Sequence, residues 1–259
     1  MTQQTGETRL LEDDTLMRAA AEPISEQTER AEQSASPVVA GVQLEIDCAG
    51  TLWWPDERLL VVSDLHLEKG SSHAERGMLI PPYDTAATLA KLAVVIARRD
   101  PARVISLGDS FHDRRAASRL SGPDLDALTA IMQGRDWIWI SGNHDPEAPD
   151  DLDGTCTAEL AIGPLVFRHE PRAGNAPGEI AGHLHPAARV RARGRSVRRR
   201  CLASDGHRAI LPAFGAYTGG LNLRSRPFDS LFDASSLNAW MLGDDAVYRV
   251  PLKRLSPGV

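Results

Sequence analysis

The pattern of hydrophobic and polar positions changes at about residue 38 of this 259-residue chain. Before that point Glu, Gln, Ser, Thr and Ala dominate and large apolar side chains are few. Such a segment buries too little surface to offset the entropy that ordering would cost. Its eight acidic residues and three arginines give it a net charge of −5. We therefore expect a flexible acidic tail over residues 1–38 and one folded domain over residues 39–259.

Strand and helix patterns then alternate up to about residue 145. Apolar residues at helical spacing predict helices over Thr85–Arg99 and Asp124–Met132. Short apolar runs predict strands at Val42–Ile46, Leu59–Ser63, Val104–Leu107 and Trp137–Ile140. This alternation is typical of a largely parallel sheet.

The second half of the domain is mostly β. Short strands are predicted at Leu165–His169, Glu179–Ala181, Arg189–Arg193, Val197–Leu202, Ala209–Leu211 and Val247–Val250. Together the two halves predict an α/β fold in which two packed sheets are flanked by helices. Trp53 and Trp54 are expected in its core.

Polar residues follow five of the predicted strands directly. The segments are Asp64-Leu65-His66, Gly108–Asp113, Gly142–Asp145, His169-Glu170-Pro171 and Gly182–Pro186. They contain six of the eight histidines in the chain. Because ligands bind beyond the carboxyl ends of strands in α/β sheets, we expect the five segments to meet at one edge. Each motif alone is also typical of a hydrogen-bonded loop, and it is the ordered set of five that favours a site.

The side chains in these segments indicate metal chemistry. Carboxylate, imidazole and amide oxygen without thiolate favour Mn²⁺, Fe²⁺ or Zn²⁺ over copper or iron–sulfur centres. The three cysteines lie far apart and form no CxxC motif. Residues two apart on an extended strand point the same way. Asp64 and His66 form one such pair and His183 and His185 another, so both members of each pair would reach one metal cluster. The seven candidate ligands exceed the needs of one tetrahedral ion, and two ions sharing one carboxylate would use them all. They are Asp64, His66, Asp109, Asn143, His169, His183 and His185.

The ordered motifs Asp-x-His, Gly-Asp, Gly-Asn-His-Asp, His and Gly-His-x-His resemble the calcineurin-like metallophosphoesterase superfamily over about Leu59 to Pro186. The resemblance implies a four-layer α/β/β/α sandwich of two mixed sheets within residues 39–259. It also implies a dinuclear site, with Mn²⁺ preferred and Fe²⁺ or Zn²⁺ as alternatives. By matching motif, the first metal is held by Asp64, His66 and His185, the second by Asn143, His169 and His183, and both by Asp109.

The same resemblance assigns catalytic residues. His144 matches the residue that acts near the leaving group, and Asp145 matches the carboxylate that orients it. A hydroxide bridging the two metals would attack phosphorus in line. The string Gly-Asp-x-Phe-His-Asp also resembles the double-strand-break-repair metallonucleases, in which a histidine at the place of His112 lies near the substrate phosphate. The alternative for His112 is a hydrogen bond within its own loop. His73 and His207 have no partner motif and are expected to be solvated or structural.

The linking segments narrow the family. Several segments outside the five motifs resemble the bacterial ligase-associated DNA-damage-response phosphodiesterases. They include Glu68-Lys69-Gly70, Arg76-Gly77, Ile80–Asp84 and Leu211–Gly220. This resemblance implies a phosphodiesterase or nuclease acting on DNA in repair beside a DNA ligase, a helicase and an exonuclease. An alternative is a small-molecule phosphoesterase acting on a nucleotide or cyclic nucleotide, with a pocket capped by the 37 residues after Asn222. A third interpretation is a scaffold that has lost catalysis, but none of the seven ligands is missing.

Charge is unevenly distributed. The chain has a net charge of −6, yet residues 189–200 contain seven arginines and no acid. This run alternates with small apolar residues and predicts a hairpin that turns near Gly194-Arg195. Its exposed face would either contact a phosphate backbone or form a solvated edge. Aromatic residues are only 5% and none interleaves the arginines, which argues against base-specific contacts there.

The start of the chain is polar and acidic, without a basic segment followed by an apolar run. No window approaches the ~18 apolar residues of a membrane span. These features predict a cytoplasmic protein.

Overall fold

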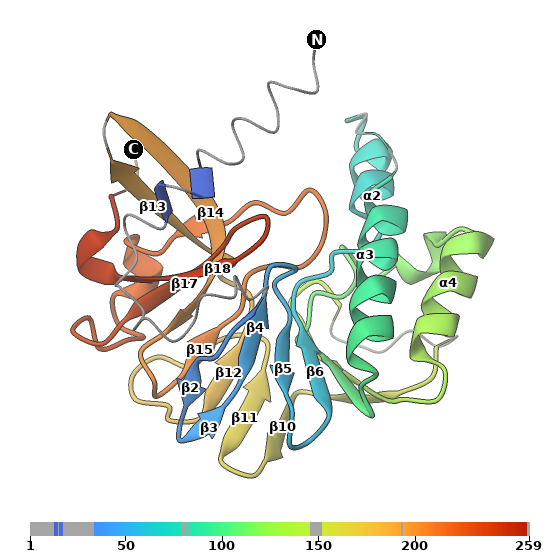
Figure 1. The fold of residues 1–259 in the computed structure, drawn as a ribbon. Coiled ribbons are helices and arrows are strands. Elements are labelled where there is room, and N and C mark those ends of the chain that lie inside the picture. Colours follow the sequence, from blue (N-terminus) through green and yellow to red (C-terminus); the bar gives the residue numbers. More distant parts are fainter. Residues whose placement is uncertain are drawn as a thin grey trace.

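The computed structural model describes residues 13–14, 16–17, 34–78, 81, 83–145, 152–192 and 194–257. Two mixed β-sheets pack against each other, and helices α3 (Asp84–Arg99) and α4 (Gly122–Met132) lie to one side (Figure 1). This arrangement confirms the α/β fold with two packed sheets. Within the described residues, no helix combines the length and the apolar character that crossing a bilayer demands.

The first sheet has the strand order β1-β4-β5-β6-β7-β8-β9. Its strands are β1 (Ser34–Ala35), β4 (Glu45–Asp47), β5 (Leu52–Trp54), β6 (Leu59–Val62), β7 (Arg103–Ser106), β8 (Asp136–Ile140) and β9 (Thr155–Thr157). From β6 to β9 neighbouring strands run parallel, as the alternating pattern predicts. The strands on the other side of β6 pair antiparallel. The carboxyl ends of β6, β7 and β8 therefore point to the same edge.

The second sheet has the order β10-β11-β12-β15-β14-β13-β16, and β17 and β18 extend it from β14. Its strands are β10 (Glu159–Ile162), β11 (Leu165–Arg168), β12 (Glu179–Ala181), β13 (Pro186–Ala192), β14 (Arg195–Ser204), β15 (Ala209–Ile210), β16 (Leu221–Asn222), β17 (Asn238–Leu242) and β18 (Val247–Pro251). The strand predicted over Val42–Ile46 is interrupted at Leu44. Val42–Gln43 (β3) pairs instead with Val38–Val39 (β2) in a separate hairpin.

Successive side chains of a strand point to opposite faces of the sheet, and this divides the core into layers. Leu59 and Val61 of β6 face residues of the second sheet such as Leu202. Leu60 and Val62, one position along, pack with α3 and α4. Trp53 and Trp54 are both buried, as predicted. Strands β5, β6, β7 and β8 of the first sheet thus contribute one face to the inter-sheet core and the other to the helical layer.

The outer face of the second sheet is covered in part by helical residues, in keeping with the predicted four-layer arrangement. Leu16 and Met17 are helical and buried there, together with residues of the short 3₁₀ helix η2 (Arg226–Phe228) and of loops, and η3 (Leu252–Arg254) packs beside them. The residues after Asn222, considered above as a possible cap, instead build β17 and β18 of the same sheet. They complete the core of the sheet.

Parts of the segment predicted to be a flexible tail are packed onto the domain. Leu16 and Met17 are buried in the core that covers β14 and β17. Asp13 forms an ion pair with Arg199 of β14, with Nη2 to Oδ2 at 3.1 Å. β1 joins the edge of the first sheet. These residues make apolar contacts and backbone hydrogen bonds that the polar composition of the surrounding segment does not predict. Residues 18–33 lie outside the described part of the chain.

Replacement of Met17 tests this docking. Because its side chain is fully buried, Met17→Ala should lower the free energy of unfolding by about 2 to 5 kcal/mol. Urea titration followed by circular dichroism measures the change. Val94→Ala, at an exposed position of α3, is the control and should have little effect. An equally stable Met17→Ala protein would contradict the packing of this segment.

Candidate metal centre

The five predicted polar segments meet at one edge of the structure, between the two sheets. The backbone N–H of His183 donates to the Asp64 carboxylate, with N to Oδ2 at 3.1 Å, which joins the loop after β12 to the loop after β6. Asp64 N–H donates to the carbonyl of Gly108 after β7 at 3.3 Å. His169 Nδ1 lies 2.8 Å from the carbonyl oxygen of Leu107 and donates to it. The prediction that these segments converge is confirmed.

One group of possible ligands consists of Asp64, His66 and His185, whose ligand atoms all lie within 4.8 Å of one another. His185 Nε2 lies 3.0 Å from Asp64 Oδ1 and 3.4 Å from His66 Nε2. The Asp64 side chain is completely buried. These are the three residues that the family resemblance assigns to the first metal.

A second group consists of Asp109, His169 and His183. His169 Nε2 lies 3.4 Å from Asp109 Oδ2 and 3.2 Å from His183 Nδ1. Because Nδ1 of His169 donates to Leu107, its Nε2 is the atom free to bind an ion. The charge of Asp109 also acts on the pKa of His66, so this carboxylate lies within electrostatic reach of both groups.

Asn143, the remaining predicted ligand, is exposed and lines the same surface hollow as His169. The preceding Gly142 allows the backbone to pass close to the centre. A Cβ at this position would lie 2.2 Å from the backbone nitrogen of Asp109. Any side chain at position 142 would therefore force the Asn143 loop away from Asp109.

Five of the seven predicted ligands adopt left-handed backbone conformations. They are Asp64 (φ 53°), His66 (46°), Asp109 (46°), His183 (66°) and His185 (45°). Such conformations cost about 1 to 3 kcal/mol each for residues other than glycine and cluster at functional sites. The expectation that the Asp-x-His and His-x-His pairs project from extended strands is therefore wrong. His183 and His185 belong to different groups, whereas Asp64 and His66 belong to the same one.

The protonation of these groups fits a divalent cation. Burial lowers the pKa of His66 to about 3, and burial together with the charge of His169 lowers that of His183. Burial opposes ionisation of Asp64, but the hydrogen bonds from His185 and Ser63 and the charges of His185 and His169 together outweigh it and lower the pKa of that carboxyl. Neutral imidazoles and ionised carboxylates are the states that bind metals. The donor set of nitrogen and oxygen suits Mn²⁺, Fe²⁺ or Zn²⁺.

His144 and Asp145 differ from the predicted arrangement. His144 Nδ1 lies 2.8 Å from the backbone carbonyl oxygen of His112 and donates to it, so its Nε2 remains available, 3.9 Å from Asp109 Oδ2. Asp145 accepts instead from the backbone N–H groups of Ser110 and Phe111, with nitrogens 2.7 and 3.0 Å from Oδ2. The main-chain carbonyl, not the carboxylate, orients His144. Asp145 holds the loop that carries Asp109.

The His112 side chain lies in a stack of rings. Its ring centroid is 5.3 Å from that of His144 and 5.6 Å from that of His73, with nearly parallel planes. Its Nδ1 is buried without a hydrogen-bond partner, which does not support the alternative of a hydrogen bond within its own loop. Helix α2 (Lys69–Glu75) brings His73 to this position. Sequence reasoning missed His73 because no motif links it to the other histidines.

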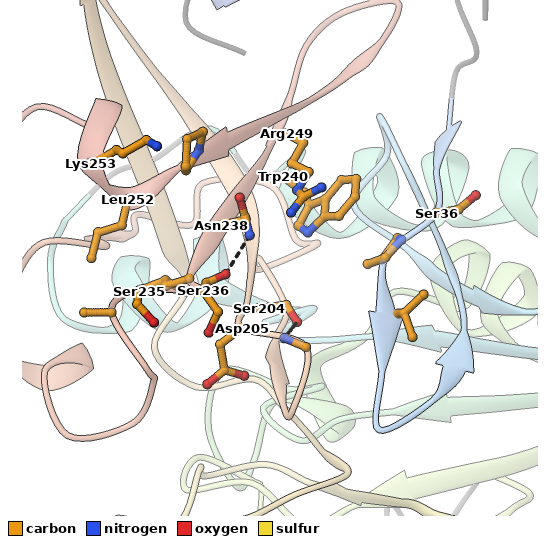
Figure 2. A pocket seen from close by; sticks show the side chains of 16 residues that line it. Ser36, Ser204, Asp205, Ser235, Ser236, Asn238, Trp240, Arg249, Leu252 and Lys253 are labelled. Carbon is orange, nitrogen blue, oxygen red and sulfur yellow. Dashed lines mark hydrogen bonds between the residues drawn. The ribbon is translucent and has the colours of Figure 1, made fainter. Parts of the chain in front are cut away.

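Figure 2 shows a different hollow, with a volume of about 520 Å³, beside β17 and β18. Trp240, Arg249 and Lys253 line it. Its Asn238 side chain donates to the carbonyl of Ser236 at 2.6 Å, so that polar group is used internally (Figure 2). None of the predicted site residues lines this hollow, which is therefore separate from the metal centre.

His169 gives the metal centre a pH dependence. Burial would lower its pKa, but the hydrogen bond to Asp109 and the charges of Asp64 and Asp109 raise it to about 9 in the metal-free chain. Below that pH a proton must leave His169 before an ion binds, so metal affinity should rise with pH and level off above about 9.

Calorimetric titration with Mn²⁺ at about pH 7.5, in two buffers of different ionisation enthalpy, should count about one proton released per chain. His207→Asn, which alters a histidine outside both groups, should leave the count unchanged. Metal binding without proton release would contradict a protonated His169.

Comparison with known proteins agrees with this geometry. The family model of the calcineurin-like phosphoesterases matches residues 57–213. Pseudomonas putida nuclease MPE has a similar structure, with 29% sequence identity and a TM-score of 0.64, covering 84% of this chain and all of that one. The E. coli phosphoesterase Yfce matches at 14% identity and a TM-score of 0.37, over 75% of this chain and 98% of its own. No curated protein matches the sequence. The chain belongs to the calcineurin-like phosphoesterase family and is a metal-dependent phosphoesterase.

Proposed function

We propose that this phosphoesterase is a phosphodiesterase that cleaves DNA in repair, with Mn²⁺ as the preferred metal. The observation that carries the proposal is the pair of ligand groups that lie together at one edge with His144 beside them. The similarity to a Pseudomonas putida nuclease supports a nucleic-acid substrate. The resemblance of the linking segments to the ligase-associated family supports a repair role beside a DNA ligase, a helicase and an exonuclease.

The proposed roles of the ligands combine the two geometric groups with the family resemblance, which adds Asn143 and the sharing of Asp109. Asp64, His66 and His185 would hold one ion, and Asn143, His169 and His183 the other, with Asp109 shared between them. When bound, two divalent ions neutralise phosphate charge and acidify water. Hydrogen bonds within the chain hold the ligand side chains in position. The His183 amide donates to the Asp64 carboxylate, and His169 donates to the Leu107 carbonyl. Held in this way, the donors need little rearrangement on binding.

His144 is the proposed general acid. Its Nδ1–H is committed to the His112 carbonyl, so proton transfer takes place at Nε2, the atom on the Asp109 side of the ring. A proton held at Nε2 is given to the departing oxygen of the substrate. The parallel ring of His112 packs against His144 and limits its rotation.

A basic surface supports a polyanionic substrate. The hairpin β13–β14 begins directly after His185, and its register places Arg189 opposite Arg198, so these two and Arg191 share one face. Arg191 and Arg198 are exposed. Val190 and Val197 occupy the opposite face and are buried in the core, which fixes the arginine face outward. Arg193 lies outside the described residues.

A small-molecule phosphoesterase is the alternative function. A nucleotide-specific enzyme needs a pocket that encloses its ligand. The residues that were considered as a cap form β17 and β18 instead. The hollow beside Asn143 and His169 is open at the surface. These features favour an extended substrate over an enclosed one.

Hydrolysis of a chromogenic phosphodiester and of the matching monoester, with Mn²⁺ and with chelator, tests the chemistry. Wild type should prefer the diester and require the metal. Asp109→Ala should abolish activity and bind neither ion, whereas His144→Ala should keep its metals and turn over about 100- to 10,000-fold more slowly. Metal analysis of each variant separates the two effects. Faster cleavage of the monoester would overturn the proposal in favour of a nucleotide phosphatase.

Salt dependence tests the arginine face. Arg191→Ser should weaken binding of DNA and reduce the slope of log affinity against log salt by about 0.7 to 0.9 for one lost phosphate contact. Fluorescence anisotropy at several salt concentrations measures both. Arg249→Ser, an exposed arginine beside the separate hollow, is the matched control and should keep the wild-type slope. Equal slopes for all three proteins would show that the hairpin is only a solvated edge.

A further inference from the structure

The segment that follows β15, residues 211–220, packs directly against the metal centre. The amide of Gly215 donates to the Asp64 carbonyl at 3.2 Å, and a Cβ on Gly215 would lie 2.0 Å from the Leu65 carbonyl oxygen. At the other end, a Cβ on Gly220 would lie 2.5 Å from the carbonyl oxygen of His185. The absence of side chains at these two positions lets the segment touch both loops that carry the first ligand group.

Side chains from two other elements, β14 and α3, hold this segment in place. Arg200 Nη1 donates to the Ala213 carbonyl at 2.6 Å, and Lys91 Nζ to the Phe214 carbonyl at 3.2 Å. Thr88 Oγ1 accepts from the Ala216 amide at 3.0 Å. These bonds act on a segment whose residues 211–215 are already buried, with Phe214 in the core beside α3 and α4. They give it one defined conformation beside the ligands.

Tyr217 lies between the two glycines of this fixed segment. Its side chain is 48% exposed, and its backbone is left-handed with φ 57°. Because consecutive Cα atoms are about 3.8 Å apart, its Cα lies within about 8 Å of that of Gly215, which contacts the Asp64 and Leu65 backbone. A large aromatic side chain is thus exposed to solvent within the segment that contacts the first ligand group.

Cationic groups flank Tyr217. Lys69 Nζ donates to the Tyr217 carbonyl at 3.1 Å. The same ammonium lies near His112, because after burial its charge is the largest influence that lowers the pKa of His112, to about 4. Arg198, on the basic face of the hairpin, donates to the Gly220 carbonyl. The backbone of the segment that carries Tyr217 is therefore in contact with Lys69 and with Arg198 of the arginine face.

We propose that Tyr217 is a stacking surface for the base of a nucleotide next to the phosphate bound at the metal centre, with Lys69 and Arg198 contacting the neighbouring phosphates. The proposal rests on the nuclease function proposed above. Stacking on an aromatic ring tolerates any base, since every base presents a π-face. It requires the base to be unpaired, so this contact selects single-stranded or locally opened substrate. Tyr217 is a substrate-binding residue and takes no part in proton transfer.

The test compares two single-stranded oligonucleotides of equal length, one with normal bases and one with abasic sugars throughout. Both carry the same phosphates, so only stacking distinguishes them. Tyr217→Leu should raise KM for the normal oligonucleotide by about 5- to 150-fold, the loss of one base–aromatic stack, with kcat little changed. Cleavage of the abasic oligonucleotide should be the same as in wild type. Tyr217→Phe, which keeps the ring, should behave as wild type with both.

Tyr83→Leu is the matched control, because Tyr83 is 70% exposed and lies at the start of α3. It should cleave both oligonucleotides as wild type does. Equal KM values for wild type and Tyr217→Leu, or an equal loss on the abasic oligonucleotide, would overturn the stacking role. A defect of Tyr217→Phe as large as that of Tyr217→Leu would overturn it in favour of a hydroxyl contact. Wild type that hydrolyses the chromogen but neither oligonucleotide would overturn the nuclease proposal itself.

Discussion

The metal centre depends on one buried carboxylate. Asp64 has no exposed side-chain surface, yet the hydrogen bonds it accepts keep it ionised. The Ser63 hydroxyl and the His183 amide donate to its side chain, and Gly215 donates to its backbone carbonyl. An unpaired charge at this depth would be prohibitively costly. The need to satisfy Asp64 therefore ties together the first sheet, the loop after β12 and the segment that carries Tyr217.

This dependence explains the strained backbone around the centre. To bring donors from two sheets to one carboxylate and its neighbours, the chain turns sharply at the ligands themselves. Asp109 and His185, for example, are left-handed although they are not glycine. Bound metals would offset this strain, since ligand bonds form only when the donors have converged. Folding of the edge and binding of the ions are thus coupled.

Much of this fold was predictable, because short apolar runs that end abruptly in polar residues mark both a strand and the position of the site. The strand at Glu179–Ala181 and the helix at Thr85–Arg99 show this directly, each lying within a residue of its predicted bounds. The orientation of His144 was not predictable, since its hydrogen-bond partner is the main-chain carbonyl of His112. Every residue has such a carbonyl, so the sequence does not indicate which one His144 contacts. Helix α2 was missed for a related reason: with only seven residues it has no apolar periodicity. Its position follows from tertiary contacts that the sequence pattern does not contain.

The left-handed ligands also constrain how this protein can change over evolutionary time. A residue such as valine or isoleucine is strongly disfavoured at φ near 50°, whereas glycine and asparagine accept that conformation readily. A descendant that no longer needed its metals would gain stability by acquiring glycine or asparagine at positions such as Asp64, His66 and His183. Inactivated relatives of this fold would therefore be recognisable by those two residues at the former ligand positions, because loss of catalysis would leave the turns in place.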